Sequence, residues 1–430
     1  MMKFTHRQPT LLKEKPLNKA LKTAPVIGVV LLMLNGLPAA VGATDTAAAE
    51  AEALASEEAA RDALMGDVRA YLKRIEAQES SDGAFAPGLT EDLLGLGLAL
   101  QRNGDHEQAV RIFKRGIHLS RINEGLYSRR QLALLEGEIA SHIALGALSE
   151  ADERQRYLYR VQAKTLSDVT RGQALMEHAL WQRQAYEAGI GEDPFARLVN
   201  MWSLYRFALS EFAKVEGETS PMLLPPLYGM LRAQYMLSGF VGETTSGRYR
   251  TGGVYGDEES RQIGYRSQSY KHGNAVIRAI YDIQVAQSDV TLKDTAEVLL
   301  LLGDWQYWHG KRAEALDTYA QLYGELEETE AAQALREQLF ASPQPLPGLA
   351  GVRALPQHSG EQEGRLLLEF GVSERGRVMD VVRLDDHMHN DEKAGDIINR
   401  LRRTPFRPRI DDGLPVETEG LRWAYDTSAW

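Results

Sequence analysis

The stretch Leu93–Leu119, LLGLGLALQRNGDHEQAVRIFKRGIHL, decides the fold of this 430-residue chain. Apolar residues recur at helical spacing on both sides of Gly104-Asp105, a pair typical of a tight turn. Small residues stand where two helices would touch: Gly97 in the first half, and Ala109 and Gly116 in the second. The stretch therefore predicts two antiparallel helices joined by a tight turn.

This hairpin resembles the tetratricopeptide (TPR) repeat, a unit of about 34 residues. If Gly104 occupies roughly position 15 of such a unit, then Gly97, Ala109, Phe113 and Gly116 fall on about positions 8, 20, 24 and 27 of the pattern. At three of these positions the helix backbones approach too closely for a large side chain. The alternative interpretation is an ordinary helical hairpin.

A single unit of this kind cannot bury its own apolar face, so further units are expected. The best second unit is Leu299–Leu326, LLLLGDWQYWHGKRAEALDTYAQLYGEL. The chain is therefore predicted to form a TPR-like superhelix over residues 85–340. In the second unit the packing positions are occupied by Gly303, Gly310, Ala315 and Tyr319.

The beginning of the chain has the layout of a secretory signal peptide. Six Lys or Arg residues precede the apolar run Ala24–Leu34, and Val41-Gly42-Ala43 offers small residues to a signal peptidase. We expect residues 1–43 to be removed. The alternative is an uncleaved inner-membrane anchor, because residues 24–43 are about long enough to cross a bilayer. Residues 44–84, rich in Ala and Glu, predict an N-terminal capping helix.

Charge and composition exclude several classes of function. The chain has a net charge of −11, and loss of residues 1–43 leaves 43 basic against 59 acidic residues, a net charge of −16. Such an acidic protein is a poor partner for nucleic acid, whose phosphates need a basic surface. The absence of cysteine excludes disulfides, thiolate metal sites and a cysteine nucleophile.

Residues 242–273 interrupt the helical period. The stretch is rich in glycine and long for a loop in a compact domain, which favours either a functional or a disordered loop. Because Tyr and Arg side chains often anchor interfaces, a partner-binding loop is one interpretation and a mobile insertion is the other. The candidate partner-binding residues of this stretch are Tyr249, Arg250, Tyr255, Arg261, Tyr265, Arg266 and Tyr270.

After residues 341–363, a Pro- and Gly-rich linker that predicts a domain boundary, the pattern changes from helical to alternating. Residues 364–430 predict a small α+β domain of β-β-α-β order behind a mostly α body. Arg407 and Arg409 border the third strand and are candidate contacts for a partner carboxylate. The expected elements of the small domain are Arg365–Val372, Arg377–Leu384, Asp391–Arg403 and Val416–Asp426.

The string GRLLLEFGVSERGRVMDVVRL, a helix, and then TPFRPRIDDGLPV and LRWAY resemble the C-terminal domain of the TonB energy-transducer family over Gly364–Tyr425. The resemblance implies a domain that docks an envelope partner by adding one of the partner's segments as an edge strand. The chain departs from that family in three respects. The Tyr-Pro that family members carry shortly before the first strand is not found in Pro345–Glu363. The chain has no long Pro-Glu/Pro-Lys spacer, and its apolar N-terminal segment contains no histidine.

These features favour a non-enzymatic periplasmic adaptor that binds a protein or peptide partner of the Gram-negative cell envelope in the groove of the TPR region. The alternative is an inner-membrane-anchored, TonB-like transducer that supports transmembrane transport at the outer membrane; only an uncleaved N-terminal segment would then contact the membrane. An enzyme would need a catalytic motif or polar pocket that the sequence does not announce. His387 and His389 could bind a metal, but a solvated loop is the plainer interpretation, and no metal or cofactor is predicted.

Overall fold

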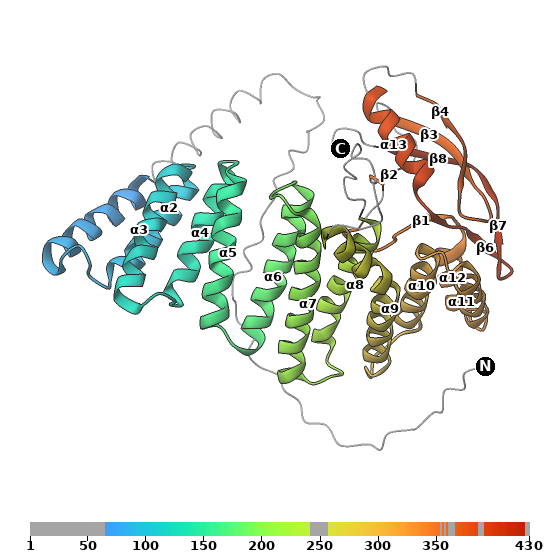
Figure 1. The fold of residues 1–430 in the computed structure, drawn as a ribbon, viewed down its shortest axis with the longest axis horizontal. Coiled ribbons are helices and arrows are strands. Elements are labelled where there is room, and N and C mark those ends of the chain that lie inside the picture. Colours follow the sequence, from blue (N-terminus) through green and yellow to red (C-terminus); the bar gives the residue numbers. More distant parts are fainter. Residues whose placement is uncertain are drawn as a thin grey trace, which may run out of the picture. The chain divides into compact units, whose positions relative to one another are not determined.

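The computed structural model describes residues 65–240, 257–352, 355–356, 358–359, 366–385 and 391–425. Within these residues a helical body runs to Phe340 and a small strand region follows it (Figure 1). The predicted signal peptide lies outside the described residues, as do Tyr249, Arg250, Tyr255, His387 and His389. No helix within the described ranges is both long and apolar enough to cross a membrane.

The helical body consists of helices that pack against their neighbours in chain order (Figure 1). A helix over residues 65–82, in the expected capping segment, comes first. The expected mostly helical chain with a small C-terminal strand region is confirmed. The following helices are α2 (Leu89–Arg102), α3 (His106–Glu124), α4 (Arg130–Ala144), α5 (Leu148–Thr165), α6 (Asp168–Glu187), α7 (Pro194–Glu216), the short 3-10 helix η1 (Pro221–Leu223), α8 (Leu224–Gly239), α9 (Asp257–Val285), α10 (Leu292–Trp308), α11 (Arg312–Glu325) and α12 (Glu330–Phe340).

The turns of the two repeat units require glycine. Gly104 between α2 and α3 has a φ of +82°, and Gly310 between α10 and α11 has a φ of +73°. This left-handed region is readily entered only by glycine. Five residues after each turn lies a fully buried alanine, Ala109 or Ala315. Gly116 faces a leucine of α4, so a side chain at this position would collide with the next helix pair.

In each unit an aromatic ring fills the space beside a glycine. A Cβ on Gly97 would overlap the ring of Phe113, and a Cβ on Gly303 would overlap the ring of Tyr319. Both rings are fully buried. Phe113 also packs against Gly137 of α4, so one ring joins α3 to the helices on both of its sides. These contacts bring the helix backbones together at the repeat positions.

The prediction of a loop over residues 242–273 is wrong for the second half of that range, because residues from Asp257 onward form α9. The buried positions of α9 do follow a helical period, but the first two are Ser269 and Gly273, which are not apolar. Gly273 is required there, because a Cβ would overlap the indole of Trp305. Hydrophobic periodicity could not reveal a helix face that begins with a serine and a glycine.

The C-terminal region contains an antiparallel four-stranded sheet of order β2-β8-β3-β4. Its apolar core is formed by alternating residues of β3, the inner face of α13, Phe406 and Tyr425. The observed order of the main elements, β3, β4, α13 and β8, is the expected β-β-α-β. The bounds are β1 (Gln344–Pro345), β2 (His358–Ser359), β3 (Leu366–Val372), β4 (Val378–Arg383), α13 (Asp391–Arg403), β5 (Phe406–Arg407), β6 (Arg409–Asp411), β7 (Leu414–Val416) and β8 (Thr418–Tyr425).

The described helical and strand regions belong to one compact unit, so the boundary predicted at residues 341–363 does not separate two independent bodies. The physical reason is that the linker is packed rather than solvated. Leu346 is fully buried and Leu349 nearly so, and β1 of the linker pairs with β5. The described part of this segment, residues 344–352, lies against the helices.

Candidate interaction face of the helical body

The first helices of successive pairs contact one another and line one face of the body. The Gln101 amide on α2 donates to the Gly137 carbonyl oxygen of α4 at 2.7 Å. The Trp308 indole N–H on α10 donates to Ser238 Oγ of α8 at 2.8 Å. We call the surface formed by α2, α4, α6, α8 and α10 the first-helix face.

One part of this face is occupied by the chain's own linker. Arg232 Nε of α8 donates to the Ala350 carbonyl oxygen at 2.8 Å. Leu349 joins the large apolar cluster formed by α6 to α10, and Leu346 joins the cluster formed by α10 to α12. The Leu346 N–H donates to the Pro405 carbonyl oxygen at 2.8 Å, which ties the linker to the turn before β5. The first-helix face thus binds a peptide segment that turns at its end, where the Val352 N–H donates to the Leu349 carbonyl oxygen at 3.0 Å.

A buried ion pair holds the same region to β5 of the C-terminal region. Arg407 Nη1 lies 2.9 Å from both carboxylate oxygens of Asp304 on α10, and Arg407 Nη2 donates to the Leu339 carbonyl oxygen at 3.3 Å. The Tyr319 hydroxyl donates to Asp304 Oδ1 at 2.7 Å. The two charged side chains are only 7% and 4% exposed. Burial and the adjacent Asp304 carboxylate hold the pKa of Tyr319 well above its ordinary value.

The interpretation of Arg407 as a contact for an external partner is wrong, because Asp304 of its own chain already neutralises the buried guanidinium. Arg409 pairs with Asp411 on the surface of β6. It also borders a hollow of about 720 Å³ whose other wall includes Tyr323 and Phe340. Of the two candidate arginines, Arg407 and Arg409, only Arg409 is therefore available to solvent.

The other part of the first-helix face is open. Leu98 of α2, Ile143 of α4 and Leu180 of α6 are each about two-fifths exposed. The same α4 and α6 also carry two carboxylates whose charges interact, Glu136 of α4 and Glu177 of α6. Desolvation raises the pKa of Glu136, and the nearby Glu177 raises it further; desolvation also raises the pKa of Glu177. This part offers apolar contact beside unneutralised negative charge.

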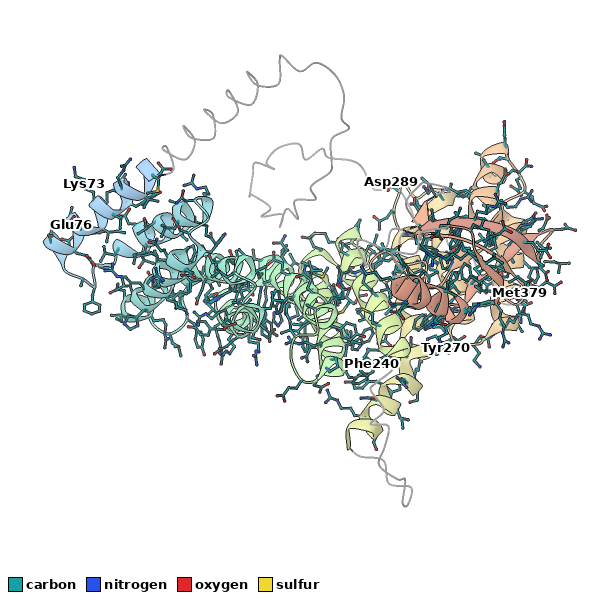
Figure 2. The ribbon with its side chains drawn as sticks, turned by 90° about the horizontal axis from the view of Figure 1, so that it is seen from above. Lys73, Glu76, Phe240, Tyr270, Asp289 and Met379 are labelled. Carbon is teal, nitrogen blue, oxygen red and sulfur yellow. The ribbon has the colours of Figure 1, made fainter. Side chains whose placement is uncertain are left out.

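The candidate residues on α9 have different surroundings. Tyr265 packs edge-on against Phe195, with ring centroids 5.9 Å apart. The Tyr270 hydroxyl donates to Glu314 at 2.7 Å, and Figure 2 shows this tyrosine on α9. Arg266 borders a hollow of about 370 Å³ with His309, and Arg261 is exposed. The two tyrosines therefore support the fold, while the two arginines face solvent.

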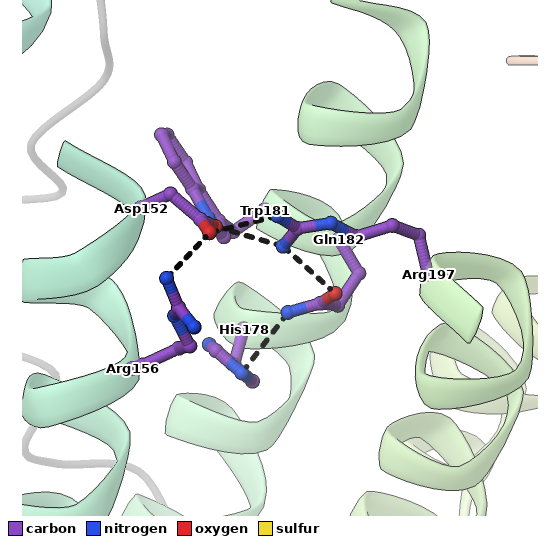
Figure 3. Close-up of polar contacts among 6 residues, drawn as sticks. All are labelled: Asp152, Arg156, His178, Trp181, Gln182 and Arg197. Atoms are coloured by element: carbon purple, nitrogen blue, oxygen red, sulfur yellow. Dashed lines mark hydrogen bonds and ion pairs between the residues drawn. The ribbon is translucent and has the colours of Figure 1, made fainter. Parts of the chain in front are cut away.

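A buried polar network joins α5, α6 and α7 (Figure 3). Arg197 donates to both oxygens of Asp152 at 2.7 Å, and the Trp181 indole N–H donates to Asp152 Oδ1 at 2.8 Å. Desolvation alone would raise the pKa of Asp152, but the hydrogen bonds from Arg197 and Trp181 outweigh it and lower the pKa. Burial lowers the pKa of His178 to about 4, and Gln182 lies 3.2 Å from its ring nitrogen.

Sequence reasoning did not find this network or the Asp304–Arg407 pair. Both join residues far apart in the chain, 45 and 103 positions respectively, and neither has a local spacing that marks it. The Asp152 carboxylate receives hydrogen bonds from Arg197 and Trp181 on two neighbouring helices, so the network acts as a polar brace. Among the described residues, no group of three or more His, Asp or Glu side chains could hold a metal ion.

Comparison with known proteins identifies a TPR repeat in this chain. The tetratricopeptide repeat family profile matches residues 297–329, which cover most of α10, the turn at Gly310 and α11. Similar solved structures include BtubC (BKLC) from P. vanneervenii, at 12% identity over 70% of this chain and 97% of that one, with a TM-score of 0.34. Another is a protein with nearly identical TPR-like repeats from Podosopora anserina, at 17% identity over 59% and 97%, with a TM-score of 0.35. No curated protein matches the sequence.

Proposed function

We propose that this protein is an exported adaptor that binds a protein partner of the cell envelope through its first-helix face. TPR-like repeats generally mediate protein–protein interaction. One observation carries the proposal: part of the face already holds a peptide segment, the linker around Leu349 and Ala350, and the adjoining part is open. The predicted signal peptide supports export to the periplasm.

The C-terminal sheet supplies the second half of the proposal, docking of an envelope partner by strand addition as in TonB-like domains. β4 lies at the end of the strand order, and Val382 and Leu384 near its end are 51% and 40% exposed. Met379, at the start of the same strand, is labelled in Figure 2. An edge strand with exposed apolar side chains is a template for a partner strand.

Photo-crosslinking in a Gram-negative host tests the proposed face. A photoreactive side chain is placed at Leu98 or Leu180, with Phe207 of α7, which is 57% exposed on a second helix, as the matched control position. We expect discrete adducts from the two positions on the first-helix face and none from Phe207. Equal labelling at all three positions, or no adduct at Leu98 and Leu180, would refute the proposal.

Intact mass and fractionation of the same protein separate adaptor from transducer. A soluble periplasmic species that begins at Thr44 is the expected result. A full-length species in the inner membrane would favour the TonB-like energy transducer instead.

A further inference from the structure

The segment Ser342–Val352, SPQPLPGLAGV, is packed as a ligand would be. Leu346 and Leu349, three residues apart, enter two different apolar clusters of the helical body. Arg232 donates to the backbone at Ala350, a contact that does not depend on the side chain there. Gly351 has a φ of +82° and lies so close to the guanidinium groups of Arg183 and Arg232 that a Cβ would collide with them. The segment thus combines apolar anchors with main-chain recognition, two features by which bound peptides are held.

The polar end of this site is specific for a guanidinium. Asp304 receives Arg407 through two 2.9 Å contacts, and the Tyr319 hydroxyl fixes the carboxylate in place. Planar arginine matches a carboxylate in this way, whereas lysine is a point charge. Because Arg407 lies in β5 and not in the linker, the site is filled by two separate pieces of chain held together by the pairing of β1 with β5.

We infer that α6, α8 and α10 carry a peptide-binding site whose ligand is a leucine-containing segment that turns beside Arg232, and that the linker occupies this site in cis, with Arg407 on the adjoining Asp304. A partner segment of the same chemistry binds there by displacing the linker. The inference rests on the proposed function, since it assigns a partner class and a form of autoinhibition to the same face.

The test uses the full-length protein and a fluorescent peptide of the sequence SPQPLPGLAGV as the probe. Two variants are designed to release the docked linker. Leu349→Ser removes a buried leucine of the linker, and Arg407→Gln removes the ion pair that β5 makes beside it. Wild type and the control Arg409→Gln, an exposed arginine two residues away, should bind the probe weakly. Each release variant should bind it at least tenfold more tightly by fluorescence anisotropy, and adding Arg232→Ala should abolish the gain.

Amide hydrogen exchange over residues 344–352 accompanies each titration. Faster exchange of the linker with unchanged protection of α6 and α8 shows release without unfolding. If the linker is released in either variant and the probe still does not bind, or if the probe binds wild type as tightly as the variants, the inference is overturned. Crosslinking at Leu98 and Leu180 is independent of this result, so failure here and failure of the proposed function are distinguishable.

Discussion

At the scale of the residue, the molecule depends on a few long-range polar contacts that neutralise buried charge. Asp304 and Arg407 are the clearest case, because both side chains are almost fully buried and each neutralises the charge of the other. A buried ion pair adds little net stability compared with apolar packing, but removal of one partner leaves an uncompensated charge. Substitution of Arg407 should therefore reduce the free energy of unfolding far more than substitution of its exposed neighbour Arg409.

We predict that Arg407→Ala lowers the free energy of unfolding by about 3–5 kcal/mol, because it strands the Asp304 carboxylate in the interior. Arg409→Ala, which removes only an exposed pair with Asp411, should change it by less than about 1 kcal/mol. Denaturant unfolding followed by tryptophan fluorescence measures both. Equal effects of the two substitutions would contradict the burial of Arg407.

His178 makes stability depend on pH. Burial lowers its pKa from 6.5 to about 4, so the unfolded chain binds its proton at a higher pH than the folded one does. The contribution of His178 is therefore fully present above pH 6.5 and is lost as pH falls toward 4, by about 3 kcal/mol at most. Glu136 and Glu177, whose pKa values are raised, affect stability in the opposite direction. The folded state takes up their protons at a higher pH than the unfolded state does, so these two groups add stability as the pH falls.

The measurement is the difference in unfolding free energy between wild type and His178→Gln at pH 7 and at pH 4.5, which cancels the contributions of the other groups. The wild type should lose more stability on acidification than the variant does. A pH profile unchanged by the substitution would show that His178 is not buried in its neutral form.

At the scale of the element, sequence patterns identified those helices whose contacts are local and regular. Gly104 and Gly310 were predictable as turns because a left-handed residue between two apolar periods is a strong signal. The strands and helix of the C-terminal region were predictable because their apolar residues alternate or recur on one face. The first half of α9 was not predictable, because its buried face starts with Ser269 and Gly273 and its stability comes from Trp305 on another helix.

Proline scanning distinguishes a helix from a loop in α9. We predict that Ser267→Pro destabilises the protein by about 3 kcal/mol, because proline removes a helical hydrogen bond and clashes with the preceding turn. Gly264→Ala is the control: a Cβ there meets nothing within 4 Å, so this variant should be up to about 1 kcal/mol more stable. Circular dichroism and thermal unfolding report both effects. A neutral Ser267→Pro variant would mean that the segment is not helical.

At the scale of the whole molecule, the helical body and the strand region behave as one unit because the linker is part of the packing. The sequence predicted a boundary at residues 341–363 from proline and glycine content, which describes the local chain but not its long-range contacts. Neither the burial of Leu346 nor the pairing of β1 with β5 has a local signature. The candidate site was therefore predictable as a helical face, but not its occupation by the chain itself.

Calorimetry tests whether the helical body and the strand region unfold together. Wild-type protein should unfold in a single main transition, because the Asp304–Arg407 pair and the linker leucines couple the two regions. In Leu349→Ser the strand region should separate into an earlier transition at lower temperature, while the helical transition remains near its original position. Two transitions already present in the wild type would show that the docked linker does not couple the regions.

The docked linker also limits the distance between the C-terminal sheet and the helical body. While residues 344–352 lie against α8 and α10, the C-terminal sheet stays beside the helices, and the edge of β4 can meet only a partner brought to the helical body. A fully extended chain spans about 3.5 Å per residue, so residues 341–363, once undocked, would carry the sheet up to about 80 Å away. Release of this segment would therefore increase the distance over which the sheet can move. Occupancy of the first-helix face would then determine how far from the helices the sheet can meet a partner.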